Sequence, residues 1–143
     1  MNNAHLRFHH FGLAVRHPNS AKQFLSALGY EFGTPVFDPG QNVNLAMCVH
    51  AVEPAVEVIW PGENPGPLDK LNARHASGIV YHVCYETDNL SAALEQLAAS
   101  GLNPICISQP RPAPLFGGCP VSFYNIVGIG LIEIVETNVR PAA

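Results

Sequence analysis

The chain has 143 residues, of which 48% are hydrophobic and 13% are charged, and its formal net charge is -4. This length and composition suit one packed globular domain and exclude a disordered chain. With only seven lysine and arginine residues in total, the chain lacks the basic surface that binds nucleic acids. We therefore expect no nucleic-acid partner.

The N-terminal segment MNNAHLRFHHFG lacks the charged start and following apolar run of a signal peptide. No segment approaches the roughly 18 apolar residues of a membrane-spanning helix. We therefore expect a cytoplasmic protein that does not bind a membrane. The cysteines form no C-x-x-C pair, which is typical of reduced thiols; they are Cys48, Cys84, Cys106 and Cys119.

The first half of the chain begins with a strand-like segment, FHHFGLAV, followed by a helical segment, HPNSAKQFLSALGY. Asn19 or Ser20 can cap the start of this helix, and Gly29 can end it. Three more strand-like segments follow: EFGTPVF, VNLAMCVH and AVEVIWP. The hydrophobic residues at helical spacing are Phe24, Leu25 and Leu28.

The second half has the same order of elements. A linker rich in Pro, Gly and Asn, with a short helical turn DKLNAR, leads to the strand-like segment IVYHVCYE. The helical segment DNLSAALEQLAASG follows, with Asp88 as its predicted cap and Gly101 as its end. Its apolar face consists of Leu90, Leu94 and Leu97. The strand-like segments NPICISQ, VSFYNIV and GLIEIVE complete the half.

Equal spacing supports an internal repeat. His10 precedes Gly29 by 19 residues, and His82 precedes Gly101 by 19 residues. Each half is therefore a βαβββ module, and the predicted class is α+β, with one domain over 1-143 and repeats at about 8-61 and 79-137. A sheet covered by a helix on one face leaves its other face apolar, so two modules gain by pairing around a cleft.

Two histidines and two glutamates recur at equivalent places in this repeat. His10 and His82 lie in the opening strands, whereas Glu57 and Glu133 lie in the closing strands, at offsets of 72 and 76 residues. A carboxylate within an apolar strand costs several kcal/mol unless it is paired or bound to a cation. These four residues therefore predict one site for a divalent transition ion, Co, Ni, Mn, Fe or Zn, because imidazole nitrogen disfavours calcium and magnesium. His9 precedes His10 and is expected to point to the opposite face.

From FHHFGLAV to GLIEIVE, the chain resembles the vicinal oxygen chelate superfamily, which includes glyoxalase I, methylmalonyl-CoA epimerase, extradiol dioxygenases and drug-resistance binding proteins. The stretch WPGENPGPLDKLNARHASGIVYHVCYETDNLSAAL is similar to the epimerase branch. The resemblance implies a glyoxalase-like fold, the four metal ligands above and proton transfer by Glu133. Epimerases often have Gln where this chain has Glu57. A Glu at this position makes the four ligands equally similar to those of bacterial glyoxalase I. The strand that would carry a second base offers Asn42 and Asn44 but no carboxylate.

The resemblance implies an isomerase or epimerase that removes the proton alpha to a carbonyl, on an acyl thioester of the methylmalonyl-CoA type. Glu133 and Glu57 are the predicted catalytic carboxylates, one for each face of the planar intermediate. One alternative is a glyoxalase I-like lyase that acts on a hemithioacetal. Another is a non-catalytic small-molecule-binding or resistance protein. An extradiol dioxygenase fits less well because a fourth protein ligand would occupy a position that those enzymes keep open.

Four further residues are candidates for binding the substrate. Lys70 and Arg74 lie four apart on the linker helix, and Arg111 lies in QPRPAPLFGG. All three could bind CoA phosphates, although a solvated helix face is the favoured interpretation of Lys70 and Arg74. The apolar loop around Phe116 either closes over a substrate or packs on the sheet. Exposed edge strands also predict a homodimer.

Overall fold

The computed structural model describes residues 4–138, which fall into two compact units. The N-terminal unit is His10–Tyr81, and the C-terminal unit comprises the described residues from His82 onward together with those before His10. Each unit combines a mixed sheet with a helix on one face, so the predicted α+β class is confirmed.

In the N-terminal unit the sheet order is β2-β4-β5-β1, with β3 also paired to β4. β1 runs parallel to β5, and the other pairs are antiparallel. The expected strand EFGTPVF is split at Gly33–Pro35, where proline lacks the N–H that a strand ladder needs. The elements are β1 (Arg7–Ala14), α1 (Asn19–Ala27), β2 (Glu31–Phe32), β3 (Val36–Asp38), β4 (Val43–Val49), β5 (Ala55–Pro61) and α2 (Pro67–Arg74).

Helix α1 packs on this sheet through a narrow face. Leu25 is buried, in a cluster that includes Val58 of β5, whereas Phe24 and Leu28 are 64% and 53% exposed. Helical spacing alone therefore did not indicate which of these three residues the sheet buries. The predicted cap was wrong, because Asn19 is already helical and Pro18 precedes the helix without a side-chain cap.

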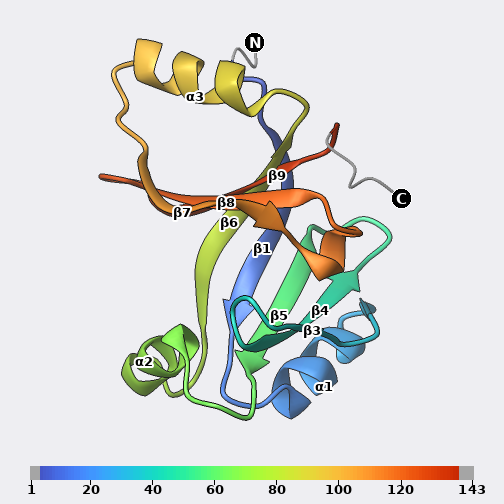
Figure 1. Cartoon of the computed structure of the whole chain (residues 1–143). Helices are drawn as coiled ribbons and strands as arrows, with labels where there is room; N and C mark the ends of the chain where they lie inside the picture. The colour runs from blue at the N-terminus through green and yellow to red at the C-terminus, as the bar shows by residue number, and fades with distance from the viewer. Residues whose placement is uncertain (1–3, 139–143) are drawn as a thin grey trace. The chain divides into compact units, whose positions relative to one another are not determined.

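The C-terminal unit repeats the same topology, with sheet order β6-β9-β8-β7. Here β6 runs parallel to β9, β9 is antiparallel to β8, and β8 is antiparallel to β7. Figure 1 shows α3 over one face of this sheet. The elements are β6 (Ile79–Thr87), α3 (Leu90–Ala99), β7 (Ile105–Pro112), the 3-10 turn η1 (Pro114–Phe116), β8 (Pro120–Ile126) and β9 (Gly130–Glu136).

The leucine face predicted for α3 is confirmed. Leu90, Leu94 and Leu97 pack against a buried cluster on β8 and β9 that includes Ile134. The cap is one residue later than predicted, since the side chain of Asn89 accepts the N–H of Ala92. Each main helix ends before a glycine, as expected, and these residues have positive φ. The two glycines are Gly29 and Gly101.

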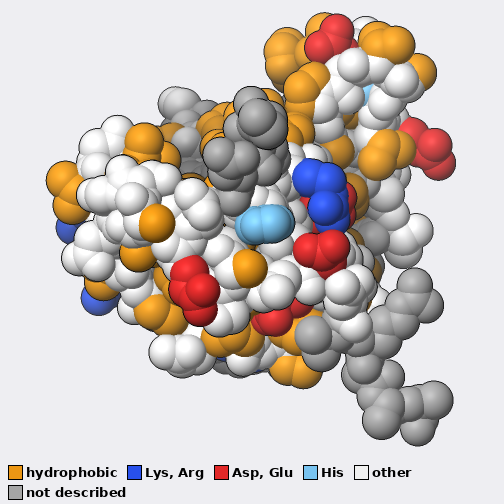
Figure 2. All heavy atoms as spheres, turned by 90° about the horizontal axis from the view of Figure 1, so that it is seen from above, with side chains coloured by type: hydrophobic (Ala, Val, Ile, Leu, Met, Phe, Trp, Pro, Cys, Tyr) orange, Lys and Arg blue, Asp and Glu red, His pale blue; other side chains and the backbone are white. Residues whose placement is uncertain are grey.

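The surface agrees with the low basic content of the chain. On the face drawn in Figure 2, the described lysine and arginine side chains stand apart or beside acidic groups and form no continuous basic patch. Arg7, for example, pairs with Glu86 at 3.3 Å. Within residues 4–138, no helix has the length and hydropathy needed to cross a membrane. None of the four cysteines, which all lie within the described residues, forms a disulfide. The homodimer remains a prediction.

Candidate metal centre

The first half of the candidate site lies on two neighbouring parallel strands of the N-terminal unit. His10 comes from β1 and Glu57 from β5, and their Nε2 and Oε2 atoms are 3.5 Å apart. Glu57 is aligned with Gly12, two residues after His10, so both side chains lie on the same face of the sheet. His10 is 0% exposed and Glu57 is 2% exposed. The structure thus joins the first predicted His and Glu as a buried pair.

Strand alternation explains why Glu57 is separated from the helix-covered core. Val58 packs in the α1 cluster and Trp60 packs against it, and Glu57 lies on the other face of β5. Its partner across the antiparallel pair is Met47 of β4. The carboxylate therefore has an apolar cross-strand neighbour in addition to the imidazole 3.5 Å away.

The second half of the candidate site repeats this arrangement in the C-terminal unit. His82 comes from β6 and Glu133 from the parallel neighbour β9, with Nε2 and Oε1 3.7 Å apart. They are 2% and 3% exposed, respectively. Glu133 is aligned with Cys84, two residues after His82, just as Glu57 is aligned with the residue two after His10. The internal repeat therefore extends to the register of the four predicted ligands.

Phe123 is a site residue that the sequence did not predict. It lies opposite Glu133 on β8, and its ring meets the His82 ring edge to face, with centroids 5.6 Å apart. An aromatic residue within a strand is typical of the core, but only the register with β9 and the ring contact with His82 show that Phe123 packs beside the His–Glu pair.

Burial determines the charge of the second imidazole. It lowers the pKa of His82 to about 3, because a protonated ring loses its hydration inside the protein. His82 is therefore neutral near pH ~7, which is the form that binds a metal ion. A neutral imidazole does not balance the charge of the adjacent carboxylate, whereas a divalent cation would.

The donor atoms suit a transition ion. Each unit has one imidazole and one carboxylate side by side, on buried residues. Two such pairs would supply the mixed nitrogen and oxygen set that Zn, Co, Ni, Mn or Fe accepts, whereas calcium and magnesium prefer oxygen alone. The residues present therefore fit the predicted class of ion.

The predicted substrate-binding residues lie on different elements. Lys70 and Arg74 are exposed on α2. Arg111 is opposite Val121 on β8, and Val121 is opposite Val135 on β9, so Arg111 lies on the face of this sheet that carries Glu133. Phe116 packs against the Val121 cluster, and the same ring meets that of His9 edge to face at 5.5 Å. The Phe116 ring thus packs on the sheet here, and its contact with a substrate stays a prediction.

The two asparagines considered as sources of a second base point elsewhere. Asn44 is aligned with Trp60, on the α1 side of the sheet, and its amide donates to the backbone oxygen of Pro61 at 3.2 Å. Asn42 donates to the backbone oxygen of Asn64. The residue of β4 that lies opposite Glu57 is Met47. β4 therefore supplies no acid or base beside Glu57.

Two βαβββ units, each with a buried His–Glu pair at the same register, define a glyoxalase-like α+β protein. The family model for the Glyoxalase/Bleomycin resistance protein/Dioxygenase superfamily matches residues 9–123. The chain belongs to this superfamily.

Curated relatives include two epimerases. The ethylmalonyl-CoA/methylmalonyl-CoA epimerase of Cereibacter sphaeroides is 24% identical over 106 residues, which cover 73% of this chain and 78% of the relative. The mitochondrial methylmalonyl-CoA epimerase of Bos taurus is 29% identical over 92 residues, covering 64% of this chain and 52% of the relative.

Solved structures share the fold. The methylmalonyl-CoA epimerase of Mycobacterium tuberculosis has a TM-score of 0.72 at 18% identity, covering 95% of this chain and 88% of that one. A methylmalonyl-CoA epimerase in complex with methylmalonyl-CoA and NH4+ has a TM-score of 0.71 at 20% identity, covering 95% and 99%.

Proposed function

We propose that this protein is a metal-dependent epimerase that removes and returns the proton alpha to the carbonyl of an acyl thioester. A 2-substituted malonyl-CoA such as methylmalonyl-CoA is the proposed substrate. The observation that carries the proposal is the repeated, buried His–Glu pair at one register in both units. The epimerases among the relatives supply the substrate class.

The two pairs would together hold one divalent transition ion through His10, Glu57, His82 and Glu133. Burial of all four side chains and their equivalence in the repeat support this assignment. When bound, the ion would polarise the carbonyl oxygen of the substrate and so make the alpha proton acidic enough for a carboxylate base. The protein would contribute fixed ligand positions on strands, which hold side chains more precisely than loops do.

Glu133 would move the proton. Its carboxylate is buried beside His82 and lies opposite Phe123 of β8, so bulk water is excluded from the group that would accept the proton. Inversion of a stereocentre needs proton delivery to the opposite face, and Glu57 is the equivalent carboxylate of the other unit. Since β4 offers no acidic side chain beside Glu57, we assign the second role to Glu57 itself.

Arg111 would bind an anionic part of the substrate, because it lies on the face of the sheet that carries Glu133. Lys70 and Arg74 on the exposed side of α2 would contribute at most a peripheral attraction to CoA phosphates, since solvent screens such charges. The assembly that we expect in the cell is a cytoplasmic homodimer.

A glyoxalase I-like reaction is the second candidate, and the carboxylate of Glu57 is the feature that favours it. That reaction would move a proton between neighbouring carbons of a hemithioacetal. Both reactions begin with removal of a proton next to a carbonyl, so Glu133 would act as the base in either one. The two reactions differ in their substrate.

The test is exchange of the alpha proton in D2O with one stereoisomer of methylmalonyl-CoA, followed by mass spectrometry and chiral analysis. Wild-type protein with added metal should incorporate deuterium and erode the stereochemistry. Glu133→Gln should lose about 100-fold or more in rate, since it keeps the shape of the side chain and removes its basicity. Glu63→Gln, at an exposed loop position, is the matched control and should retain activity.

Unchanged exchange by Glu133→Gln would contradict the role given to Glu133. Turnover of the hemithioacetal of methylglyoxal without exchange of the thioester would instead establish the glyoxalase reaction. Failure of both reactions with metal bound would contradict both enzyme assignments.

A further inference from the structure

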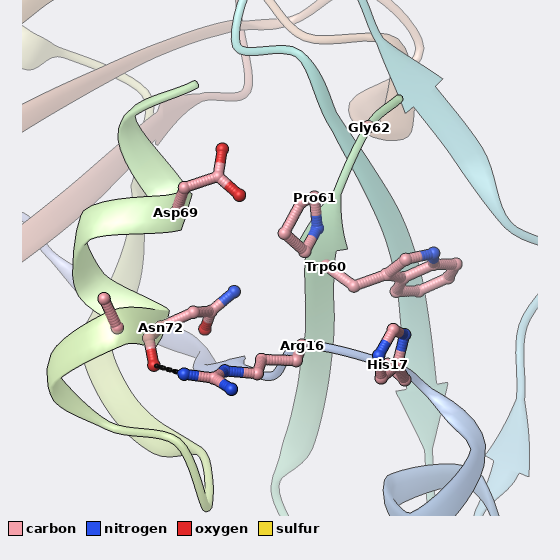
Figure 3. A pocket seen from close by; sticks show the side chains of 8 residues that line it. Arg16, His17, Trp60, Pro61, Gly62, Asp69 and Asn72 are labelled. Atoms are coloured by element: carbon pink, nitrogen blue, oxygen red, sulfur yellow. Dashed lines mark hydrogen bonds between the residues drawn. The ribbon is translucent and has the colours of Figure 1, made fainter. Parts of the chain in front are cut away.

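A pocket of about 460 Å³ lies in the N-terminal unit, bounded by α2, the connection from β1 to α1 and the end of β5 (Figure 3). Its polar lining includes Arg16, Asp69 and Asn72, and its apolar lining includes Trp60 and Pro61. We propose that this pocket is a second ligand site, which binds a small zwitterion: an α-amino acid with an apolar side chain.

Asn72 provides an acceptor that the protein does not use. Its side chain lies on α2 and is buried, with 3% of the residue exposed. The Nδ2 group donates to the backbone oxygen of Val15 at 3.1 Å, which fixes the orientation of the amide. The Oδ1 atom has no hydrogen-bond partner among the described residues. A buried acceptor without a partner destabilises the folded protein, so a ligand N–H placed here would restore the missing hydrogen bond.

Arg16 places a cation on the wall of the same pocket. One of its terminal nitrogens, Nη2, donates to the backbone oxygen of Asn72 at 3.3 Å, the bond drawn in Figure 3. This contact anchors the guanidinium near α2, and a guanidinium has further N–H groups suited to a carboxylate. The pocket can therefore recognise an anionic group beside the Asn72 acceptor.

Asp69 adds the opposite charge. It lies in the first turn of α2, where its Oδ2 accepts the N–H of Gly66 at 2.6 Å. Asp69 and Asn72 are three residues apart on one face of the helix, about 4.5 Å along its axis. An acidic group on this wall disfavours a polyanion such as a diphosphate, whereas it attracts the ammonium of a zwitterion.

The remaining wall explains why the ligand should carry an apolar side chain. Trp60 and Pro61 close the pocket opposite α2 (Figure 3). Trp60 also packs against the α1 cluster, so it lies on the face of β5 opposite to Glu57. The pocket is thus separate from the His–Glu pair of this unit, and its volume is an order of magnitude above the roughly 30 Å³ of one water molecule.

Trp60 makes the proposal directly testable, because it is the only tryptophan in the chain. Titration of the purified protein with L-leucine should change the Trp60 fluorescence saturably, and calorimetry should give the same dissociation constant. Isoamylamine lacks the carboxylate and 4-methylpentanoate lacks the ammonium. Each analogue should bind about tenfold more weakly or worse, since each loses one charge-assisted contact.

Two substitutions locate the site. Arg16→Gln and Asp69→Asn should each weaken leucine binding by about tenfold or more. Lys22→Gln removes a cation of α1 that lies over the Phe32 ring outside the pocket, and it should leave binding unchanged. Because Asp69 also caps α2, circular dichroism would establish that its variant folds, and Arg16→Gln tests the proposal without disturbing the cap.

Titration up to about 10 mM leucine would reveal even millimolar affinity. If no saturable response is seen over this range, the proposal is overturned and the pocket is a water-filled cavity. Equal binding of leucine and its two analogues would overturn the zwitterion assignment, as would full binding by Arg16→Gln. These results are independent of thioester exchange, so a failed epimerase assay and a failed second site can be told apart.

Discussion

Burial of His82 gives a quantitative expectation for stability in acid. Burial lowers the pKa of this imidazole from 6.5 to about 3, so between these values the unfolded chain binds one proton that the folded protein does not. The free energy of unfolding should therefore fall as the pH decreases below about 6.5. At 1.4 kcal/mol per pH unit, the loss attributable to His82 between pH ~7 and pH ~5 is about 2 kcal/mol.

Urea unfolding monitored by circular dichroism at both pH values would measure this loss. A chelator in the buffer removes any contribution from bound metal. His82→Gln removes the titrating group, so its stability should depend less on pH than that of the wild type, by about 2 kcal/mol over this interval. His75→Gln is the control, since His75 is exposed at the end of α2. Equal pH dependence of wild type and His82→Gln would refute the inference that His82 is buried and neutral.

Three further outcomes follow from the same structure. Elemental analysis should find about one divalent transition ion per wild-type chain after reconstitution and far less in folded His82→Ala, and equal metal contents would contradict the proposed site. Ile134→Ala should lower the free energy of unfolding in urea by about 2–5 kcal/mol, because Ile134 is fully buried; a change below about 0.5 kcal/mol would show that its cluster contributes little. In timed labelling with a thiol reagent near pH ~8, exposed Cys106 should react well before Cys48, whose pKa burial raises to about 11; faster labelling of Cys48 would contradict its burial.

Much of the architecture is encoded locally. Equal spacing from His10 to Gly29 and from His82 to Gly101 reveals the repeat, because the same strand, helix and turn occur in the same order. Carboxylates within apolar strands, Glu57 and Glu133, identify candidate ligands without knowledge of strand pairing, since an isolated buried charge is too costly to keep without a function.

Other features depend on partners that are distant in sequence, and only the tertiary structure decided them. Phe24 and Leu25 are both apolar residues of α1, but the sheet is in contact with only one side of the helix, so Leu25 is buried and Phe24 is exposed. Asn44 is polar and lies in a candidate strand, yet the register with β5 places it opposite Trp60 rather than opposite Glu57.

The pocket around Asn72 is the clearest example of a feature that depends on residues distant in sequence. In the sequence, Asn72 is one polar residue of a short, polar linker helix, and Arg16 lies 56 positions earlier. Packing of α2 against β5 and the β1–α1 connection buries the amide and leaves its Oδ1 without a hydrogen bond among the described residues, while the guanidinium reaches the backbone oxygen of Asn72. The sequence by itself determined which residues have metal-binding chemistry, because that depends on residue type and repeat position. Which polar groups share a pocket was decided only by long-range packing, since no local periodicity encodes the approach of segments so far apart.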